Sequence, residues 1–211
     1  MTMPHTAAAA YHRRVATSRL GGPEGNERLT ALTGAALLIL FAAEGVTLLR
    51  LGRLLYWHYF LGLLLIGPVC LKLASTIYRF FCYYTRREPY VRKGPPHPLL
   101  RLIGPLIVLS TIAVLGTGVL LGIDRQPRPY FGFSLLFLHK LSFLAWAALM
   151  TVHVLAYLPR LPRLLAADAA PTRVAHAIGG RGLRYSLLVL ALGGGLSLAA
   201  WGAHLSAAWS R

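Results

Sequence analysis

A block in the first half of the chain reads LLYWHYFLGLLLIGPVCLKLASTI, from Leu54 to Ile77. Lys72 is the only Lys, Arg, Asp or Glu within it. A helix needs about 20 predominantly apolar residues to cross the roughly 30 Å hydrocarbon core of a bilayer. The block therefore predicts a transmembrane helix that carries one cation inside the membrane.

Four further apolar blocks have the length of a membrane span. They cover residues 29–49, 99–123, 133–158 and 185–201. Over the whole 211-residue chain, 56% of the residues are hydrophobic and 13% are charged, against about 25% charged residues in a soluble domain. We therefore predict an all-α integral membrane bundle with about five transmembrane helices.

The basic residues gather between the apolar blocks and at the chain ends. The N-terminal segment, the second and fourth loops and the first turn of the 99–123 block (Arg101) hold fifteen Lys and Arg, whereas the first and third loops and the C-terminal tail hold five. By the positive-inside rule, we expect a multi-pass protein of the cell membrane with a cytoplasmic N-terminus and a C-terminus outside. The expected division is a cytoplasmic tail (1–28), a five-helix transmembrane domain (29–206) and an outside tail (207–211). The net charge of +16 does not indicate a nucleic-acid partner, because the basic residues do not lie on one face of a module.

The two cysteines, Cys70 and Cys82, are assigned to one predicted helix. Twelve positions along a helix span about 18 Å, which is too far for a disulfide bond between them. No Cys-x-x-Cys-His sequence occurs, which excludes covalent c-type haem. The first 29 residues are polar and basic, so we expect no cleaved signal peptide, and the first helix would act as its own insertion signal.

Ionisable side chains inside a span are costly, which makes them candidates for function. His58 lies 21 residues before Arg79, and His139 lies 21 residues before Arg160. The two helices are expected to run in the same direction. If both arginines mark the inner rim, the two histidines lie at one depth, toward the outer leaflet. Two imidazoles at one depth on neighbouring helices can hold one haem iron between them.

A second pair of positions lies four helical turns deeper. His153 follows His139 by 14 residues, which is about 21 Å along the axis and close to the same helix face. The corresponding position after His58 is Lys72. A protonated ammonium has no lone pair for a metal, so Lys72 could be a ligand only if burial kept it neutral, and it could instead neutralise a haem propionate. One haem is therefore expected, and a second at His153 stays open.

Glycines accompany these histidines. Gly62 comes four residues after His58, where it would leave room for a porphyrin edge, although small residues also serve helix packing in lipid. The stretches that carry a resemblance to a known family are His58-Tyr-Phe-Leu-Gly62, Gly116-Thr-Gly118, Leu138-His139-Lys140 and His153-Val154. They resemble the membrane b-type cytochromes, the broad group that includes the cytochrome subunits of nickel-iron hydrogenases and formate dehydrogenases. The resemblance covers about half of the chain.

The resemblance implies a haem-binding core formed by the second to fourth helices. It implies His58 and His139 as axial ligands of one haem b, and His153 as a candidate ligand of a second haem. Gly62 and Lys72 complete the candidate cofactor-binding residues. No catalytic residue is assigned, because a cytochrome need not carry out bond chemistry itself.

These observations predict a b-type cytochrome that carries electrons between its haem and a quinone or quinol, or a redox partner protein on the outer face. The chain would be an electron-transfer subunit of an oxidoreductase rather than a stand-alone enzyme. It would be embedded in the lipid bilayer, with oligomerisation left open. The alternatives are a proton- or metal-handling transporter, with Glu44, Lys72 and the histidines along a path, and a haem-free membrane anchor subunit of a redox complex.

Several of these residues also have a purely structural interpretation. His58 and His139 could be interfacial residues, and His153 could hydrogen-bond within the bundle. Glu44, in the outer third of the first span, could pair with Lys140, orient a ligand imidazole or take part in proton uptake. The residues expected to have structural or ordinary roles are Met150, His204, His5, His12, His97 and His176.

Overall fold

The computed structural model describes residues 21–94, 98–124, 129–169 and 179–205. Within these ranges the chain is helical and has no strand, apart from an isolated bridge between Tyr130 and Phe133. This described part of the chain contains five helices that are long and apolar enough to cross a membrane. The predictions of an all-α chain and of five such helices are confirmed.

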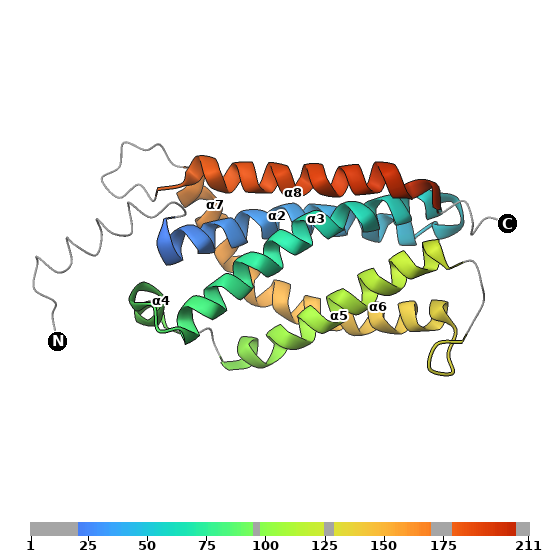
Figure 1. The fold of residues 1–211 in the computed structure, drawn as a ribbon, viewed down its shortest axis with the longest axis horizontal. Helices are drawn as coiled ribbons and strands as arrows, with labels where there is room; N and C mark the ends of the chain where they lie inside the picture. The colour runs from blue at the N-terminus through green and yellow to red at the C-terminus, as the bar shows by residue number, and fades with distance from the viewer. Residues whose placement is uncertain (1–20, 95–97, 125–128, 170–178, 206–211) are drawn as a thin grey trace, which may run out of the picture.

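The bundle is built from long helices that lie roughly parallel to one another (Figure 1). In chain order the elements are α2 (Gly22–Leu48), α3 (Leu51–Tyr84), α4 (Glu88–Lys93), α5 (Pro98–Ile123), α6 (Leu135–Tyr157), the 3-10 helix η1 (Leu158–Arg160), α7 (Leu161–Ala169) and α8 (Arg181–Gly202). The short helices α4 and α7 lie near the end where α2 begins, and α8 ends at the opposite end.

Glycine, proline and serine set several helix ends. Gly21 precedes α2 with φ of 76°, a conformation that suits glycine, and Pro23 occupies the first turn, where its missing N–H is not needed. The Ser134 side chain caps α6 by accepting a hydrogen bond from the backbone N–H of Phe137 at 3.2 Å. The sequence LPRLPR at 158–163 ends α6 and leads through η1 into α7.

Four of the five long helices are longer than the hydropathy blocks that predicted them, and α6 is three residues shorter. α2 begins at Gly22 and α3 continues to Tyr84, each seven residues beyond the predicted block. Hydropathy marks the part of a helix that lies in hydrocarbon, and polar turns can continue the same helix into the interface. The nine residues of α7 were not predicted, because so short a helix has no membrane signal. Cys70 and Cys82 both lie on α3 as free thiols, as expected.

The helices pack as two groups. α3 packs closely against α2 and α8, and α5 packs against α6. The α5–α6 pair meets α3 mainly through α5, over a smaller area. Figure 1 shows α2 and α8 on one side of the bundle and α5 and α6 on the other, with α3 running obliquely. The buried core residues Leu37, Leu65 and Val69 lie between α2 and α3.

Glycines bring α3 and α8 into backbone contact. A Cβ atom added at Gly67 would lie 2.0 Å from the carbonyl oxygen of Ala191, and one added at Gly195 would lie 2.2 Å from that of Leu64. Helices in lipid associate through close packing, which small residues at the interface permit. This contact therefore requires glycine on both helices.

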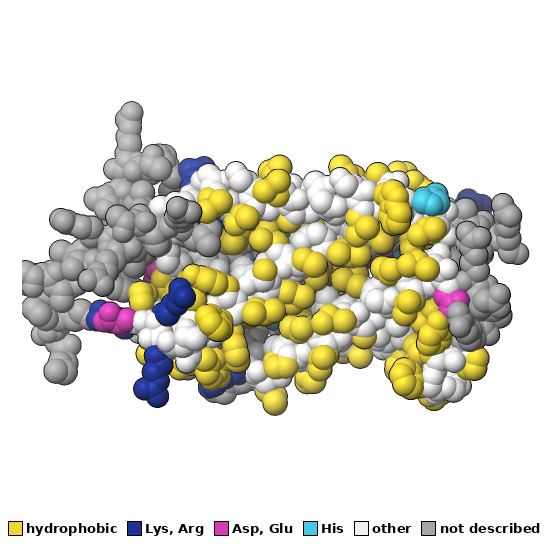
Figure 2. Space-filling view, in the orientation of Figure 1, with side chains coloured by type: hydrophobic (Ala, Val, Ile, Leu, Met, Phe, Trp, Pro, Cys, Tyr) yellow, Lys and Arg dark blue, Asp and Glu magenta, His cyan; other side chains and the backbone are white. Residues whose placement is uncertain are grey.

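Ion pairs hold α4 and α7 to one end of the bundle. Lys93 of α4 pairs with Glu27 of α2. Arg184 of α8 pairs with Asp168 of α7, and the side chains of Arg184 and Asp168 are buried. Figure 2 shows hydrophobic side chains over the middle of the visible face and most of the visible Lys and Arg at this same end. It is the end that carries the loops predicted to be cytoplasmic.

Candidate functional site

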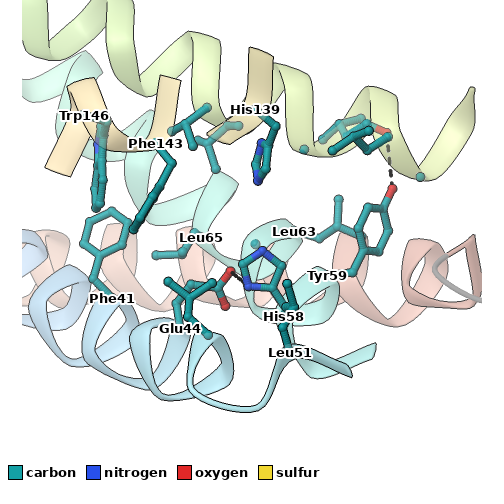
Figure 3. Close-up of a pocket in the computed structure, with 18 of the residues that line it drawn as sticks. Phe41, Glu44, Leu51, His58, Tyr59, Leu63, Leu65, His139, Phe143 and Trp146 are labelled. Carbon is teal, nitrogen blue, oxygen red and sulfur yellow. Dashed lines mark hydrogen bonds and ion pairs between the residues drawn. The ribbon is translucent and has the colours of Figure 1, made fainter. Parts of the chain in front are cut away.

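Two histidines from different helices face each other inside the bundle. The rings of His58 (α3) and His139 (α6) have centroids 6.4 Å apart and planes at 79° to each other. Figure 3 shows the two imidazoles pointing toward one another from opposite sides of a cavity. The histidines that the sequence placed at one depth are therefore neighbours in space.

The cavity between them has a volume of about 340 Å³ and is bounded by α2, α3, α5 and α6. This volume lies in the range of about 300–1,000 Å³ that is usual for ligand pockets. Its walls are mainly apolar and include Leu51, Leu55, Leu63, Leu65, Leu115 and Phe143. The polar side chains that line it are Glu44, His58, Tyr59, Thr111 and His139. An apolar cavity with few convergent polar groups is the usual form of a cofactor site.

His58 is held by two residues of α2. Its Nδ1 lies 2.9 Å from Oε1 of Glu44 and 3.0 Å from Oγ1 of Thr47. The Thr47 hydroxyl donates its hydrogen to the backbone carbonyl of Glu44 at 2.5 Å, so its oxygen is an acceptor. Both neighbours of Nδ1 are thus acceptors, and Nδ1–H is the donor. The lone pair of His58 then lies on Nε2.

His139 is held in a similar way by α5. Its Nδ1 lies 3.0 Å from Oγ1 of Thr117. The Thr117 hydroxyl donates to the backbone carbonyl of Ala113 at 2.7 Å, so its oxygen accepts the Nδ1–H hydrogen of His139. The lone pair of this ring is also on Nε2. Each histidine can therefore offer a neutral Nε2 ligand, the form in which imidazole binds metals.

Two of the candidate glycines shape this cavity. A Cβ atom at Gly118 would lie 3.2 Å from Cε1 of His139, so the lack of a side chain at Gly118 leaves room for the His139 ring. Gly62 lines the cavity, and a Cβ atom there would lie 3.8 Å from Oε1 of Glu44. Gly116 is exposed, and an added Cβ atom would meet nothing within 4 Å. Of the Gly-Thr-Gly stretch, the structure thus brings Thr117 and Gly118 to the site.

The deeper candidate pair does not belong to the cavity. Among the described residues that line it, neither Lys72 nor His153 is found. Lys72 donates from Nζ to the backbone carbonyl of Thr30 at 2.7 Å, and a Cβ atom at Gly34 would lie 2.9 Å from the same nitrogen. The His153 ring packs on Tyr157, with centroids 4.8 Å apart. A lysine inside a membrane span requires a polar partner. For Lys72 this partner is the backbone carbonyl oxygen of Thr30, between α2 and α3.

Of the three roles considered for Glu44, the contact in the structure is the one with the His58 imidazole. Lys140 is exposed. Met150 lies outside the described cavity lining, and His204 is exposed at the end of α8 beside Trp201. His5, His12, His97 and His176 lie outside the described residues.

Several residues of the site were not predicted from the sequence. Thr47 and Thr117 bind the histidines, and an aromatic wall closes one side of the cavity. In this wall Phe41 packs against Trp146 with centroids 4.7 Å apart, and Nε1 of Trp146 donates to Oγ1 of Thr111 at 3.1 Å. Thr47 follows Glu44 by one helical turn, a spacing that could have identified it. The aromatic residues carry no such signal, since aromatic residues are common in membrane spans.

The two histidines are the candidate metal-binding side chains of the cavity. Within the described residues, no group of three or more His, Cys, Asp or Glu could hold a metal ion. Zinc takes four protein ligands in structural sites and three in catalytic ones. The two facing imidazoles could therefore supply two ligands to a metal. Comparisons of the chain with family models, curated proteins and solved structures give no match.

Proposed function

We propose that this protein is a membrane-embedded b-type cytochrome with one haem b held between His58 and His139. The observation that carries the proposal is the facing pair of imidazoles across an apolar cavity, 6.4 Å apart at their centroids. Their Nδ1 atoms are engaged by Glu44, Thr47 and Thr117. The Nε2 atoms are the ones that would ligate the iron.

The separation of the two rings fits one metal between them. Metal–imidazole bonds are about 2 Å long, so two imidazoles on opposite sides of one metal have centroids about 6 Å apart. A metal-bound histidine usually donates its other N–H to a carboxylate, carbonyl or hydroxyl, which fixes the ring orientation. Both His58 and His139 have such an acceptor.

The apolar walls of the cavity support the proposal, because the body of a porphyrin is apolar. They combine leucines and aromatic rings with glycines at Gly62 and Gly118, where a side chain would project into the space. Burial among apolar residues excludes water from the metal and is one of the ways by which a protein tunes a haem. The bound haem would supply reversible one-electron transfer, and the chain would hold, orient and shield it.

The position of the cavity favours electron exchange at one face. Its lining includes Leu48 and Leu51, on either side of the turn between α2 and α3. This turn is at the end of the bundle opposite to the start of α2. With the N-terminus in the cytoplasm, as the charge bias suggests, it faces outward. A redox partner on the outer face, or a quinol in the bilayer, would then exchange electrons with this haem.

A spectrum of the purified protein tests the proposal. A reduced-minus-oxidised spectrum in mild detergent should show the sharp alpha band of a low-spin b haem. Pyridine haemochrome analysis should give about one haem per chain. A ratio near two would add a second haem, with His153 as a ligand. Protein purified from haem-replete cells without any haem would leave the anchor and transporter alternatives.

Substitution of the ligands makes the test specific. His58→Ala and His139→Ala should each remove nearly all of the haem, because either change leaves the iron with one axial ligand. His153→Ala and His204→Ala are the matched controls and should retain it, since neither residue lines the cavity. Haem content per folded chain, measured after size-exclusion chromatography, is the readout. Full occupancy in either of the first two variants would contradict the assignment.

A further inference from the structure

The two candidate ligands differ in the residue that holds them. His58 donates its Nδ1–H to a carboxylate, whereas His139 donates to a hydroxyl. We propose that Glu44 is a positioning residue that orients His58 and keeps the reduction potential of the haem low. This inference rests on the proposed function, because it requires a haem between the two histidines.

Glu44 is placed to act on His58 and on little else. Its Oε1 lies 2.9 Å from Nδ1 of His58, and its Oε2 is buried with no hydrogen-bond partner among the described residues. A buried carboxylate that is only partly satisfied is costly in an apolar environment. A positive centre nearby would offset that cost. The ferric haem, which carries one more positive charge than the ferrous form, would be such a centre on the other side of the His58 ring.

Neighbouring residues keep the carboxylate in place. Thr47, one turn along α2, contacts the same Nδ1 atom and the backbone of Glu44. Gly62 on α3 lies beside Oε1, and a Cβ atom there would make ordinary van der Waals contact with it at 3.8 Å. The carboxylate is thus held between α2 and α3 with its charge directed at the imidazole.

This arrangement acts on the iron in two ways. A carboxylate that accepts the Nδ1–H hydrogen makes the imidazole a stronger electron donor to its metal. Its negative charge also stabilises the ferric form relative to the ferrous form. Both effects lower the reduction potential, which hydrogen bonds around the ligands are known to tune. Thr117 is neutral and lacks the second effect, so the two sides of the haem contribute unequally.

The experiment compares midpoint potentials of the haem-loaded protein. Glu44→Gln keeps the shape and a carbonyl acceptor but removes the charge. It should retain the haem and its alpha band and raise the equilibrium constant for reduction at least tenfold, which is 59 mV for a one-electron couple. Thr117→Val should shift the potential by less than half as much. Glu27→Gln is the matched control, about 25 Å away along α2, and should leave the potential unchanged.

The outcomes separate the inference from the proposed function. Wild-type protein without haem contradicts the proposed function, and the inference with it. A haem-loaded Glu44→Gln variant with an unchanged potential overturns the inference alone. If Glu44→Gln loses the haem, Glu44→Asp is measured instead. Its shorter side chain should lengthen the contact with His58 and raise the potential, and a potential equal to the wild type would overturn the inference.

Discussion

Two faces of α3 are built in opposite ways. On the face toward α8, Gly67 and Gly195 let the helix backbones touch, and no Cβ atom fits at either position. On the face toward α5 and α6, the helices stand apart around a cavity of about 340 Å³. One helix therefore joins a closely packed half of the bundle to an open half. Close packing on the first face can hold α3 in place while the second face keeps room for a cofactor.

Glycine serves both faces for different reasons. Gly67 removes a side chain so that two helices can approach, and Gly62 removes one so that a space remains. The two positions are five residues apart, which places them about 140° apart around the helix. Substitution at each position should therefore separate the stability of the bundle from the proposed binding of haem.

The largest effect is expected at the α3–α8 contact. Gly67→Leu should prevent correct packing, since its Cβ atom alone would overlap the Ala191 carbonyl oxygen. Overpacking usually costs about 1–3 kcal/mol, and a clash with rigid backbone should cost more. We expect loss of the monodisperse peak in size-exclusion chromatography. Gly193→Leu, on an exposed part of α8 with nothing within 4 Å of the added Cβ atom, is the control and should behave as wild type.

The next largest effect is expected on the open face of α3, and it should change haem content rather than folding. Gly62→Leu should leave the folded protein monodisperse but strongly reduce its haem content, because the new side chain would occupy the cavity. Gly116→Leu, on an exposed position of α5, should bind haem normally. Haemochrome content per chain and thermal melting are measured on the same samples. If Gly62→Leu lowered the melting temperature as well as the haem content, this face would also contribute to the stability of the bundle.

The smallest effect is expected within the α5–α6 pair. Thr111→Val removes the acceptor of the Trp146 hydrogen bond with little change of volume. Side-chain hydrogen bonds between membrane helices contribute about 0.6 kcal/mol on average. For a chain of this size, that corresponds to a shift in melting temperature of roughly 1–3 °C. Haem content should stay unchanged, and a loss of haem would show that the aromatic wall depends on this one bond.

Local properties of the sequence determined the helices and the depth of the histidines. In lipid a span must satisfy its own backbone hydrogen bonds, so a long apolar block has few alternatives to a helix. A helix also has a fixed rise per residue, so counting from Arg79 and Arg160 was enough to place His58 and His139 at one level. The helix ends were less predictable, because α2 and α3 continue beyond their apolar blocks.

Tertiary structure alone decided which side chains share a cavity. Lys72 and His153 lie at related depths by the same counting, yet neither lines the cavity, and Lys72 binds the Thr30 carbonyl between α2 and α3. The sequence was compatible with three roles for Glu44, and the packing of α2 on α3 brings its carboxylate to the His58 ring. Depth follows from the rise of a single helix. Contact depends on how each helix is rotated about its axis and which neighbours it meets, and those are set by side-chain packing between segments far apart in the sequence.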